Sequence, residues 1–237
     1  MLTLLNIGNT HTEIANWENG KLSLVKVVPS CELAAADLPP GKIAAASVVP
    51  EVSRRLAAER NINFISAFNC HDLIDFSMVD SSTLGADRVA NAVALGHFFP
   101  LPALVADCGT ALTIEIVDEK RRFVGGAIAP GRTLMRKSLA LGTAQLPEIP
   151  LNSQLPDFAG VDTVSSIALG IDGAIHAMLG ALVDKVKAHI ELGACVITGG
   201  DAKFFLDKLP NTFTPAPELF TLYGVLLAAG EKIPEVI

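Results

Sequence analysis

Short apolar runs that alternate with polar, glycine-containing turns predict β-strands at the start of the chain. One strand is expected around Leu4 and Leu5, followed by a turn centred on Gly8 and a second strand over residues 12–17. The dipeptide Asn19-Gly20 then predicts a two-residue hairpin, because both positions tolerate positive φ. A third strand is expected over residues 22–27.

The same pattern recurs 101 residues later in the chain. When LLNIGNTHTEI is placed over LVADCGTALTI, Asn6 aligns with Asp107, Gly8 with Gly109 and Asn9 with Thr110. Strands are again expected after the turn, over residues 113–117 and 123–129, with DEKRR as a weaker reversal between them. Three elements aligned in the same order favour an internal duplication.

The remaining segments alternate between strand and helix patterns. Strands are expected at 43–49 and 62–66 and in CVIT, and helices at 51–60, 84–97, 164–190, after TGG and in LFTLYGVLLAAG. Pro50 suits the first turn of a helix, and Ser82 or Thr83 could cap the next one. The alternation indicates an α/β fold, which we expect to form two similar lobes, residues 1–100 and 101–237.

Composition excludes several classes of protein. Half of the 237 residues are apolar, and the net charge of −7 comes without a basic stripe, so neither nucleic acid nor a membrane surface is expected as a partner. The four cysteines lie far apart without a CxxC pair, which argues against a zinc site or disulfide framework and favours small buried residues. No apolar run reaches about 18 residues, so we expect a soluble, cytoplasmic protein.

The glycine turns suggest a binding site for phosphate. A tight turn lined by Gly8, Asn9 and Thr10 exposes successive N–H groups, which suit an anion. TGG at residues 198–200 is a third turn of this kind. A single such turn is more often an ordinary connection, but three in a duplicated frame favour a nucleotide-binding cleft between two lobes.

Acidic residues beside these turns are candidates for chemistry. Asp107 follows a strand directly and could hold a cation near phosphates. Asp87, in LGADRVANA, lies in the first turn of a predicted helix, where it could accept a proton from an attacking hydroxyl. Arg88 could bind a substrate carboxylate through two hydrogen bonds. Spacing alone favours a helix-stabilising aspartate and an exposed or ion-paired arginine.

Six motifs together resemble one family. NIGNT, LGADRVANA, DCGTALT, GGAIAPG, TAQLP and TGG occur in the order and at the separations seen in type III pantothenate kinases, members of the acetate kinase, sugar kinase, Hsp70 and actin superfamily. The resemblance spans nearly the whole chain. It implies two ribonuclease H-like (actin-like ATPase) lobes, with mixed sheets flanked by helices and an interlobe cleft. It also implies ATP-dependent phosphorylation of pantothenate, the first step of coenzyme A biosynthesis.

The resemblance also implies roles for individual residues. ATP would be bound by the first turn and by one residue of the second lobe: Asn6, Ile7, Gly8, Asn9, Thr10, His11, Thr12, Glu13 and Thr110. Pantothenate would contact Met78, Gly85, Ala86, Asp87 and Arg88, with Asp87 as the proton acceptor, and Thr163 would contact it across a homodimer interface. Asp107 would bind a monovalent cation, K⁺ or NH₄⁺, used beside Mg²⁺.

Two positions depart from the family pattern. Asn6 stands where the family has aspartate, which predicts weaker Mg²⁺ binding unless a carboxylate such as Glu13 substitutes. Met78 stands where the family commonly has tyrosine, which predicts a reshaped pocket with one hydroxyl fewer. Two alternatives therefore stay open. The chain could be a weak or inactive regulatory homologue, like the Bvg accessory factor-type relatives, or a kinase for another small hydroxy acid.

Overall fold

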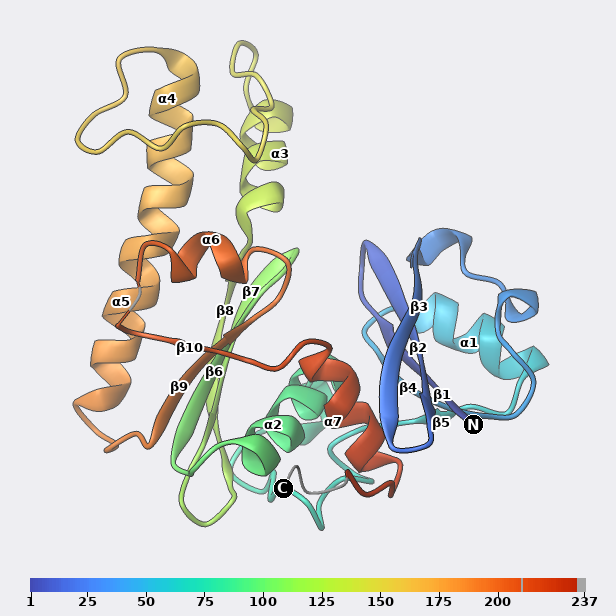
Figure 1. The fold of residues 1–237 in the computed structure, drawn as a ribbon. Helices are drawn as coiled ribbons and strands as arrows, with labels where there is room; N and C mark the ends of the chain where they lie inside the picture. Colours follow the sequence, from blue (N-terminus) through green and yellow to red (C-terminus); the bar gives the residue numbers. More distant parts are fainter. Residues whose placement is uncertain (210, 234–237) are drawn as a thin grey trace. The chain divides into compact units, whose positions relative to one another are not determined.

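A computed structural model describes residues 1–209 and 211–233, which contain two five-stranded sheets (Figure 1). The first sheet has the order β3-β2-β1-β4-β5 and the second the order β8-β7-β6-β9-β10. Their strands are β1 (Leu2–Ile7), β2 (His11–Glu18), β3 (Lys21–Pro29), β4 (Lys42–Ser47), β5 (Asn63–Phe64), β6 (Ala103–Cys108), β7 (Ala111–Val117), β8 (Phe123–Pro130), β9 (Ala194–Thr198) and β10 (Thr214–Pro215). The two orders correspond strand for strand, as the predicted duplication requires.

The first sheet is mixed, as the fold class requires. β1 pairs antiparallel with β2 and parallel with β4. Asn19 and Gly20 have φ of 53° and 76°, so the predicted hairpin between β2 and β3 is confirmed. Leu5, Ile7 and Ile14 alternate toward one face of the sheet, where they form part of a buried apolar cluster.

Seven helices were found within the described residues. They are α1 (Pro50–Glu59), α2 (Ala86–Phe98), α3 (Arg132–Gly142), α4 (Thr163–Ala168), α5 (Ala174–Lys187), α6 (Ala202–Leu206) and α7 (Phe220–Ala228). Short 3₁₀ turns cover Ser30–Glu32, Ala35–Asp37 and Ser81–Thr83. The prediction missed α3 entirely.

Two details of the predicted elements are wrong. Ser82 and Thr83 do not cap α2, because they lie in a 3₁₀ turn that Asp80 caps, and Gly85 is the N-cap residue of α2. The expected strand at 62–66 shrinks to two residues, Asn63–Phe64. The sequence predicts that all four cysteines are buried, but only Cys70 and Cys108 are, since Cys31 is exposed and Cys195 half-buried.

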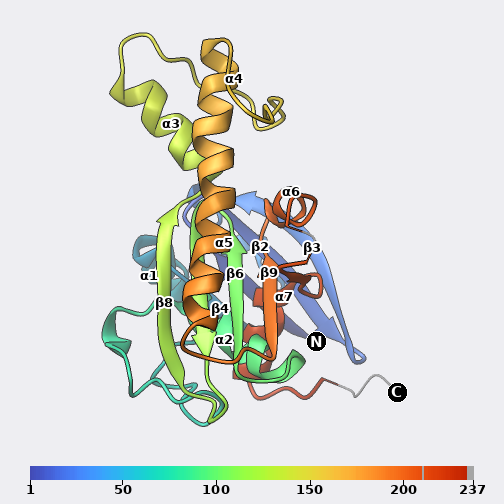
Figure 2. The same cartoon turned by 90° about the vertical axis from the view of Figure 1, so that its left-hand side faces the viewer.

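The predicted long helix is present, but it ends at Lys187 and contains a π turn. α4, the π turn Leu169–Gly173 and α5 run without a break for 25 residues. α5 lies across one face of the second sheet, and α4 extends beyond the ends of its strands (Figure 2). By length and composition alone this helix could cross a membrane. Asp172 at its middle is fully buried and ion-paired with Arg132 and Arg136.

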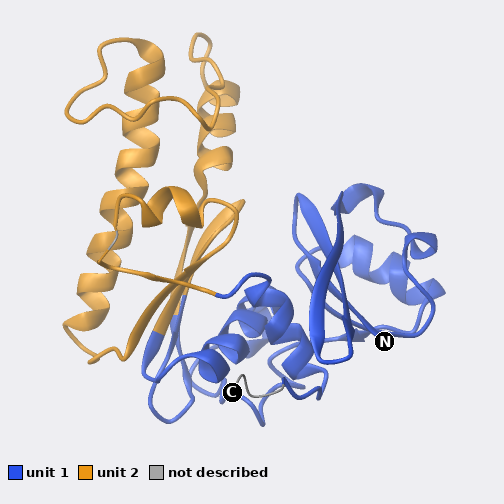
Figure 3. Ribbon diagram, in the orientation of Figure 1, with its two compact units in different colours: residues 1–103, 115–125, 217–237 blue, residues 104–114, 126–216 orange. Residues whose placement is uncertain are grey.

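The chain divides into two compact units that are discontinuous in sequence (Figure 3). Unit 1 comprises Met1–Ala103, Glu115–Gly125 and Pro217–Ile237, and unit 2 comprises Leu104–Ile114 and Gly126–Ala216. The C-terminal helix α7 thus belongs with the N-terminal part of the chain. Lobe boundaries at residue 100 and an interlobe cleft stay predictions.

Within unit 1, α7 packs against α2 at very short range (Figure 1). A Cβ on Gly224 would overlap the carbonyl group of Ala90, so only glycine allows this approach. Beside it, the buried Thr221 hydroxyl donates to Asn91 Oδ1 over 2.8 Å. The contact therefore joins two segments that are more than a hundred residues apart.

We expect Gly224→Ala to lower the free energy of unfolding by about 1–3 kcal/mol, because the added methyl group must push two helices apart. Chemical denaturation measures the change. Gly180→Ala in α5 is the matched control, since a Cβ there meets no atom within 4 Å. That variant should be neutral or gain up to about 1 kcal/mol from helix propensity. Equal effects of the two substitutions would contradict the close α2–α7 contact.

Candidate active site

The first glycine turn joins β1 to β2, and two hydrogen bonds at Gly8 hold its backbone in place. The Gly8 N–H donates to the His11 carbonyl over 3.1 Å, and the Ser30 hydroxyl donates to the Gly8 carbonyl over 2.6 Å. Asn9, Thr10 and His11 are exposed. The turn is therefore fixed in shape while its polar side chains stay accessible to a ligand.

Two of the residues predicted to bind ATP have buried side chains. Ile7 is 1% exposed, and Thr12 is fully buried with its hydroxyl 2.9 Å from that of Ser30. Any contact of Ile7 or Thr12 with a nucleotide would have to come from the backbone.

Asn6, one of the two departures from the family pattern, faces Glu13 across the β1–β2 pair. Asn6 Nδ2 donates to Glu13 Oε2 over 3.1 Å, and both residues are half-buried. Aspartate at position 6 would bring two carboxylates together at this distance, and their repulsion would be unfavourable. The carboxylate that the resemblance leads us to expect at position 6 is thus found on the facing strand.

The predicted catalytic aspartate lies at the N-terminus of α2. Gly85 is the N-cap residue and Asp87 the second residue of the helix, and Asp87 Oδ1 accepts the Arg88 N–H over 2.7 Å. A Cβ on Gly85 would stand 2.7 Å from the same oxygen, which is too close for a real contact. Glycine at position 85 therefore makes room for the Asp87 carboxylate.

The environment of Asp87 makes its carboxylate more basic. Burial raises the pKa of the Asp87 carboxyl above its ordinary value, and the Arg88 N–H and charge oppose this rise only in part. A carboxylate with a raised pKa is a stronger proton acceptor than one on the open surface. The site therefore suits removal of a proton from a hydroxyl group.

Arg88 is held by a carboxylate that sequence reasoning missed. Its Nε donates to Glu115 Oε1 over 2.8 Å, and the two side chains are 14% and 0% exposed. The guanidinium carbon lies 5.6 Å from the centre of the Phe123 ring. The available signal was an acidic residue inside the apolar strand pattern LTIEIV.

The segment that precedes α2 is tied to the β7–β8 hairpin. The Asp75 N–H donates to the Arg121 carbonyl over 2.9 Å, and the Phe123 N–H donates to the Asp75 carbonyl over 2.8 Å. Met78, three residues further on, is 53% exposed and so accessible to a ligand. Its role in substrate binding stays a prediction.

In unit 2, the turn at Asp107 meets the turn at Gly199. A Cβ on Gly199 would stand 2.5 Å from Asp107 Oδ1 and 2.6 Å from the Cys108 nitrogen, and Gly199 has a φ of +93°. The Asp201 N–H donates to the Cys108 carbonyl over 3.0 Å. Only glycine at position 199 therefore leaves room for the Asp107 carboxylate.

A carboxylate held beside such a turn can bind a hard cation. Residues 1–209 and 211–233 contain no group of three or more His, Cys, Asp or Glu side chains that could hold a metal ion. A cation at Asp107 would therefore take its remaining ligands from backbone oxygens, water or a bound phosphate.

The second glycine turn is also fixed by the end of β8. The Gly131 N–H donates to the Thr110 carbonyl over 2.9 Å, and a Cβ on Gly131 would overlap the Gly109 carbonyl. Thr110 itself is exposed. The conformation of this turn therefore depends on GGAIAPG, the motif that ends at Gly131.

Unit 2 also contains a buried ion cluster that the sequence analysis missed. Arg132 and Arg136 each form two hydrogen bonds of 2.8–2.9 Å with the Asp172 carboxylate, and Arg132 Nη1 bonds Asp201 over 2.9 Å. Burial would raise the pKa of the Asp172 carboxyl, but the two arginines outweigh it and hold the pKa below its ordinary value. The cluster joins α3, the π turn and the turn after Gly200.

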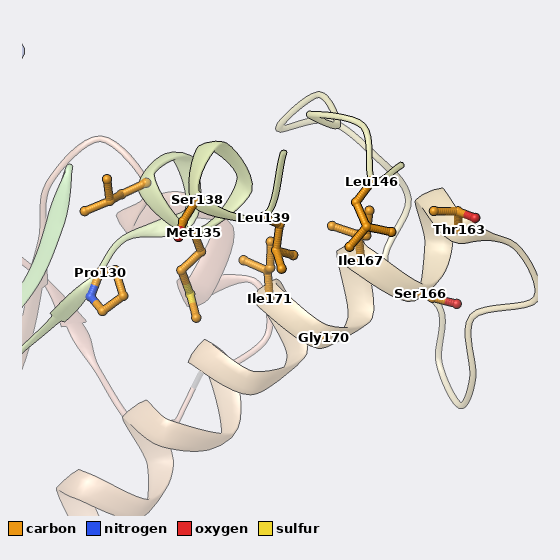
Figure 4. Close-up of a pocket in the computed structure, with 11 residues that line it drawn as sticks. Pro130, Met135, Ser138, Leu139, Leu146, Thr163, Ser166, Ile167, Gly170 and Ile171 are labelled. Carbon is orange, nitrogen blue, oxygen red and sulfur yellow. The ribbon is translucent and has the colours of Figure 1, made fainter. Parts of the chain in front are cut away.

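Beyond the second sheet, α3, residues 143–162 and α4 form a segment that we call the arm. α3 and the long helix line an open pocket of about 940 Å³. Leu139, Leu146, Ile167 and Ile171 project toward one another in it, and Thr163 lies at one end (Figure 4). Three apolar side chains of the arm are 88–92% exposed: Leu141, Phe158 and Val161.

The predicted site residues fall into two groups. Unit 1 holds the first turn, Met78 and the Gly85–Arg88 segment, and unit 2 holds Asp107, Thr110 and Thr163. Within unit 1, Gly85, Asp87 and Arg88 are in direct contact, as are Asn6 and Glu13. Thr163 is exposed at the start of α4, on the arm.

Comparison with known proteins identifies one family. A family model described as type III pantothenate kinase matches residues 2–185. The type III pantothenate kinase of Thermosipho melanesiensis is 33% identical over 226 residues, which cover 87% of this chain and 90% of that protein. That of Thermosipho africanus is 32% identical and covers 88% and 90%, and that of Methylacidiphilum infernorum is 29% identical and covers 95% and 87%.

Solved structures share the fold at lower sequence identity. A protein assigned to the Baf family of transcriptional activators, from Campylobacter jejuni, superposes with a TM-score of 0.68 at 19% identity, covering 96% of this chain and 97% of that one. A polyphosphate/ATP-glucomannokinase from Arthrobacter gives 0.54 at 15% identity, covering 98% and 100%. These likenesses confirm the actin-like α/β fold.

We expect Asn6→Asp to make stability depend on Mg²⁺. In chelator the variant should lose about 1–3 kcal/mol of unfolding free energy, because the hydrogen bond to Glu13 is replaced by repulsion between carboxylates. Added Mg²⁺ should restore the loss, as measured by denaturation with and without the ion. Adding Glu13→Gln to the variant should abolish the dependence. An Asn6→Asp protein as stable as wild type in chelator would contradict the Asn6–Glu13 pairing.

Proposed function

This chain belongs to the type III pantothenate kinase family and is a kinase, and we propose that it transfers the γ-phosphoryl group of ATP to the primary hydroxyl of pantothenate. This reaction is the first step of coenzyme A biosynthesis. The observation that carries the proposal is the Asp87–Arg88 pair at the N-terminus of α2, where Gly85 leaves room for a carboxylate whose pKa is raised by burial.

The two residues of the pair would act on different parts of the substrate. Asp87 would accept the proton of the primary hydroxyl as its oxygen attacks phosphorus, and Arg88 would bind the carboxylate of pantothenate. Phosphoryl transfer depends mainly on such positioning and on charge stabilisation around the moving group. The helix N-terminus adds N–H dipoles that favour negative charge nearby.

The glycine turns would bind the nucleotide. Asn9, Thr10 and His11 are exposed on the first turn, and Thr110 is exposed on the second, so all four are accessible to phosphate. We propose Asp107 as the ligand of K⁺ or NH₄⁺, and Glu13 with Asn6 as the residues beside Mg²⁺. When bound, these cations would neutralise phosphate charge, which fits turns that contain no lysine or arginine.

We further propose a cytoplasmic homodimer formed through the arm. The exposed apolar side chains Leu141, Phe158 and Val161, together with the open apolar pocket, are more apolar surface than a monomer usually leaves in water. Thr163 lies in the lining of the same pocket. A second copy of this chain that covers the arm would bring Thr163 to the partner's pantothenate site.

The purified protein should convert ATP and pantothenate into ADP and 4′-phosphopantothenate when Mg²⁺ and K⁺ are present. Asp87→Asn should lower kcat by about 10²-fold or more, because the amide cannot accept the proton. Since the folded-state pKa of Asp87 is raised, stability falls as the pH rises above the unfolded-state pKa, and the full cost of ionisation is present above the folded-state pKa. The variant should therefore have an equal or higher Tm at pH 7, with the difference lost in acid.

Three outcomes would decide against this assignment. A lower Tm for Asp87→Asn at pH 7, with turnover retained, would make Asp87 a structural residue. Nucleotide binding without phosphorylated product would favour the regulatory homologue. Turnover of another acid in a panel of small hydroxy acids, but not of pantothenate, would favour the third possibility.

The substitution Phe158→Ser combined with Val161→Ser should convert the dimer to monomer, as measured by analytical ultracentrifugation, and raise the KM for pantothenate. Phe68→Ser, at a phenylalanine 89% exposed in unit 1, is the control and should leave the mass unchanged. Thr163→Ala should raise the same KM without changing the mass. A wild-type protein that is monomeric at assay concentrations would contradict the dimer.

A further inference from the structure

Glu115 is a fully buried carboxylate to which the proposed reaction gives no role. It lies on β7 and is 0% exposed within an apolar strand. A buried carboxylate is strongly unfavourable unless it is paired and hydrogen-bonded. Its partner, Arg88, comes from the GADR motif 27 residues earlier in the chain.

The position of Arg88 is defined at three points along its length. Its backbone N–H is bonded to Asp87 Oδ1 at the start of α2, its Nε to Glu115, and its guanidinium lies near the Phe123 ring. Phe123 packs in turn on Phe76, with ring centres 5.7 Å apart. Because a guanidinium is planar and rigid, a bond at Nε sets the direction in which both Nη groups point.

We infer that Glu115 is a positioning residue that orients the Arg88 guanidinium toward the carboxylate of the substrate. Selection of an anionic substrate over a neutral analogue then depends on Glu115, although Glu115 does not touch the substrate. This inference rests on the proposed function, in which Arg88 binds the carboxylate of pantothenate.

Two substitutions separate the length of the Glu115 side chain from its charge. Glu115→Asp keeps the charge but withdraws the acceptor oxygen by about one carbon–carbon bond, ~1.5 Å. Glu115→Gln keeps the length and one acceptor oxygen but removes the charge. A positioning role predicts that aspartate is the more harmful, whereas a role in charge balance alone predicts that glutamine is.

The experiment compares steady-state kinetics with pantothenate and with a pantothenamide, in which a neutral amide replaces the carboxylate. For Glu115→Asp we expect the KM for pantothenate to rise about tenfold, in line with the effect of ångström-scale misplacement. The preference for pantothenate over the amide should fall by a similar factor, while the KM for ATP stays within about twofold. Glu115→Gln should change these values by about threefold or less.

Asp118→Asn is the matched control, because Asp118 is also a buried carboxylate paired with an arginine, Arg122, at 2.6 Å. It should leave both KM values unchanged. Thermal denaturation confirms that each variant folds, and a crystal structure of Glu115→Asp should show the Arg88 guanidinium displaced. Calorimetry measures binding of the two ligands if turnover is too slow.

An unmoved Arg88 in the aspartate variant, or an unchanged preference for pantothenate, would overturn the inference. So would equal increases in the KM values for pantothenate and ATP, which indicate a general structural defect. Wild-type protein that neither binds nor phosphorylates pantothenate would overturn the proposed function instead. In that case the position of Arg88 in the crystal structure still decides whether Glu115 orients it.

Discussion

Charged side chains can be buried only when their partners are in place, and this constraint organises both units. In unit 1 the buried Glu115 holds Arg88, and in unit 2 the buried Asp172 holds Arg132 and Arg136. Removing one member of such a pair leaves an uncompensated charge, at a cost of about 3–5 kcal/mol. The first turn of α2 is thereby fixed to β7, and α3 to the long helix.

Glycine complements these ion pairs by letting backbone and carboxylate approach closely. Gly85 makes room for Asp87, Gly199 for Asp107, and Gly131 for the carbonyl of Gly109. Each glycine lies where the proposed reaction needs a fixed carboxylate or a fixed turn. The groups are therefore held in position before any ligand arrives, which reduces the reorganisation needed during catalysis.

The two departures from the family pattern have different physical consequences. At position 6 the loss of a carboxylate is matched by one on the facing strand, so Asn6 and Glu13 together keep one negative charge and gain a hydrogen bond. At position 78 no comparable substitute is evident, since Met78 is a half-exposed side chain without a hydroxyl. The first turn therefore keeps one carboxylate, on Glu13, whereas position 78 has no hydroxyl to offer a ligand.

The sequence by itself determined most of the strands and their repetition in the second half of the chain, the Asn19-Gly20 hairpin, the start of α1 at Pro50 and the positions of the glycine turns. These features depend on local rules for turns, caps and periodicity, which a short segment carries within itself. Only the tertiary structure decided the roles of Glu115 and Asp172, the start of α2 at Ala86 and the existence of the α2–α7 contact. Such features depend on which distant segments come into contact. In the sequence, a buried charge or a close-packed glycine cannot be told from an ordinary one until its partner is known.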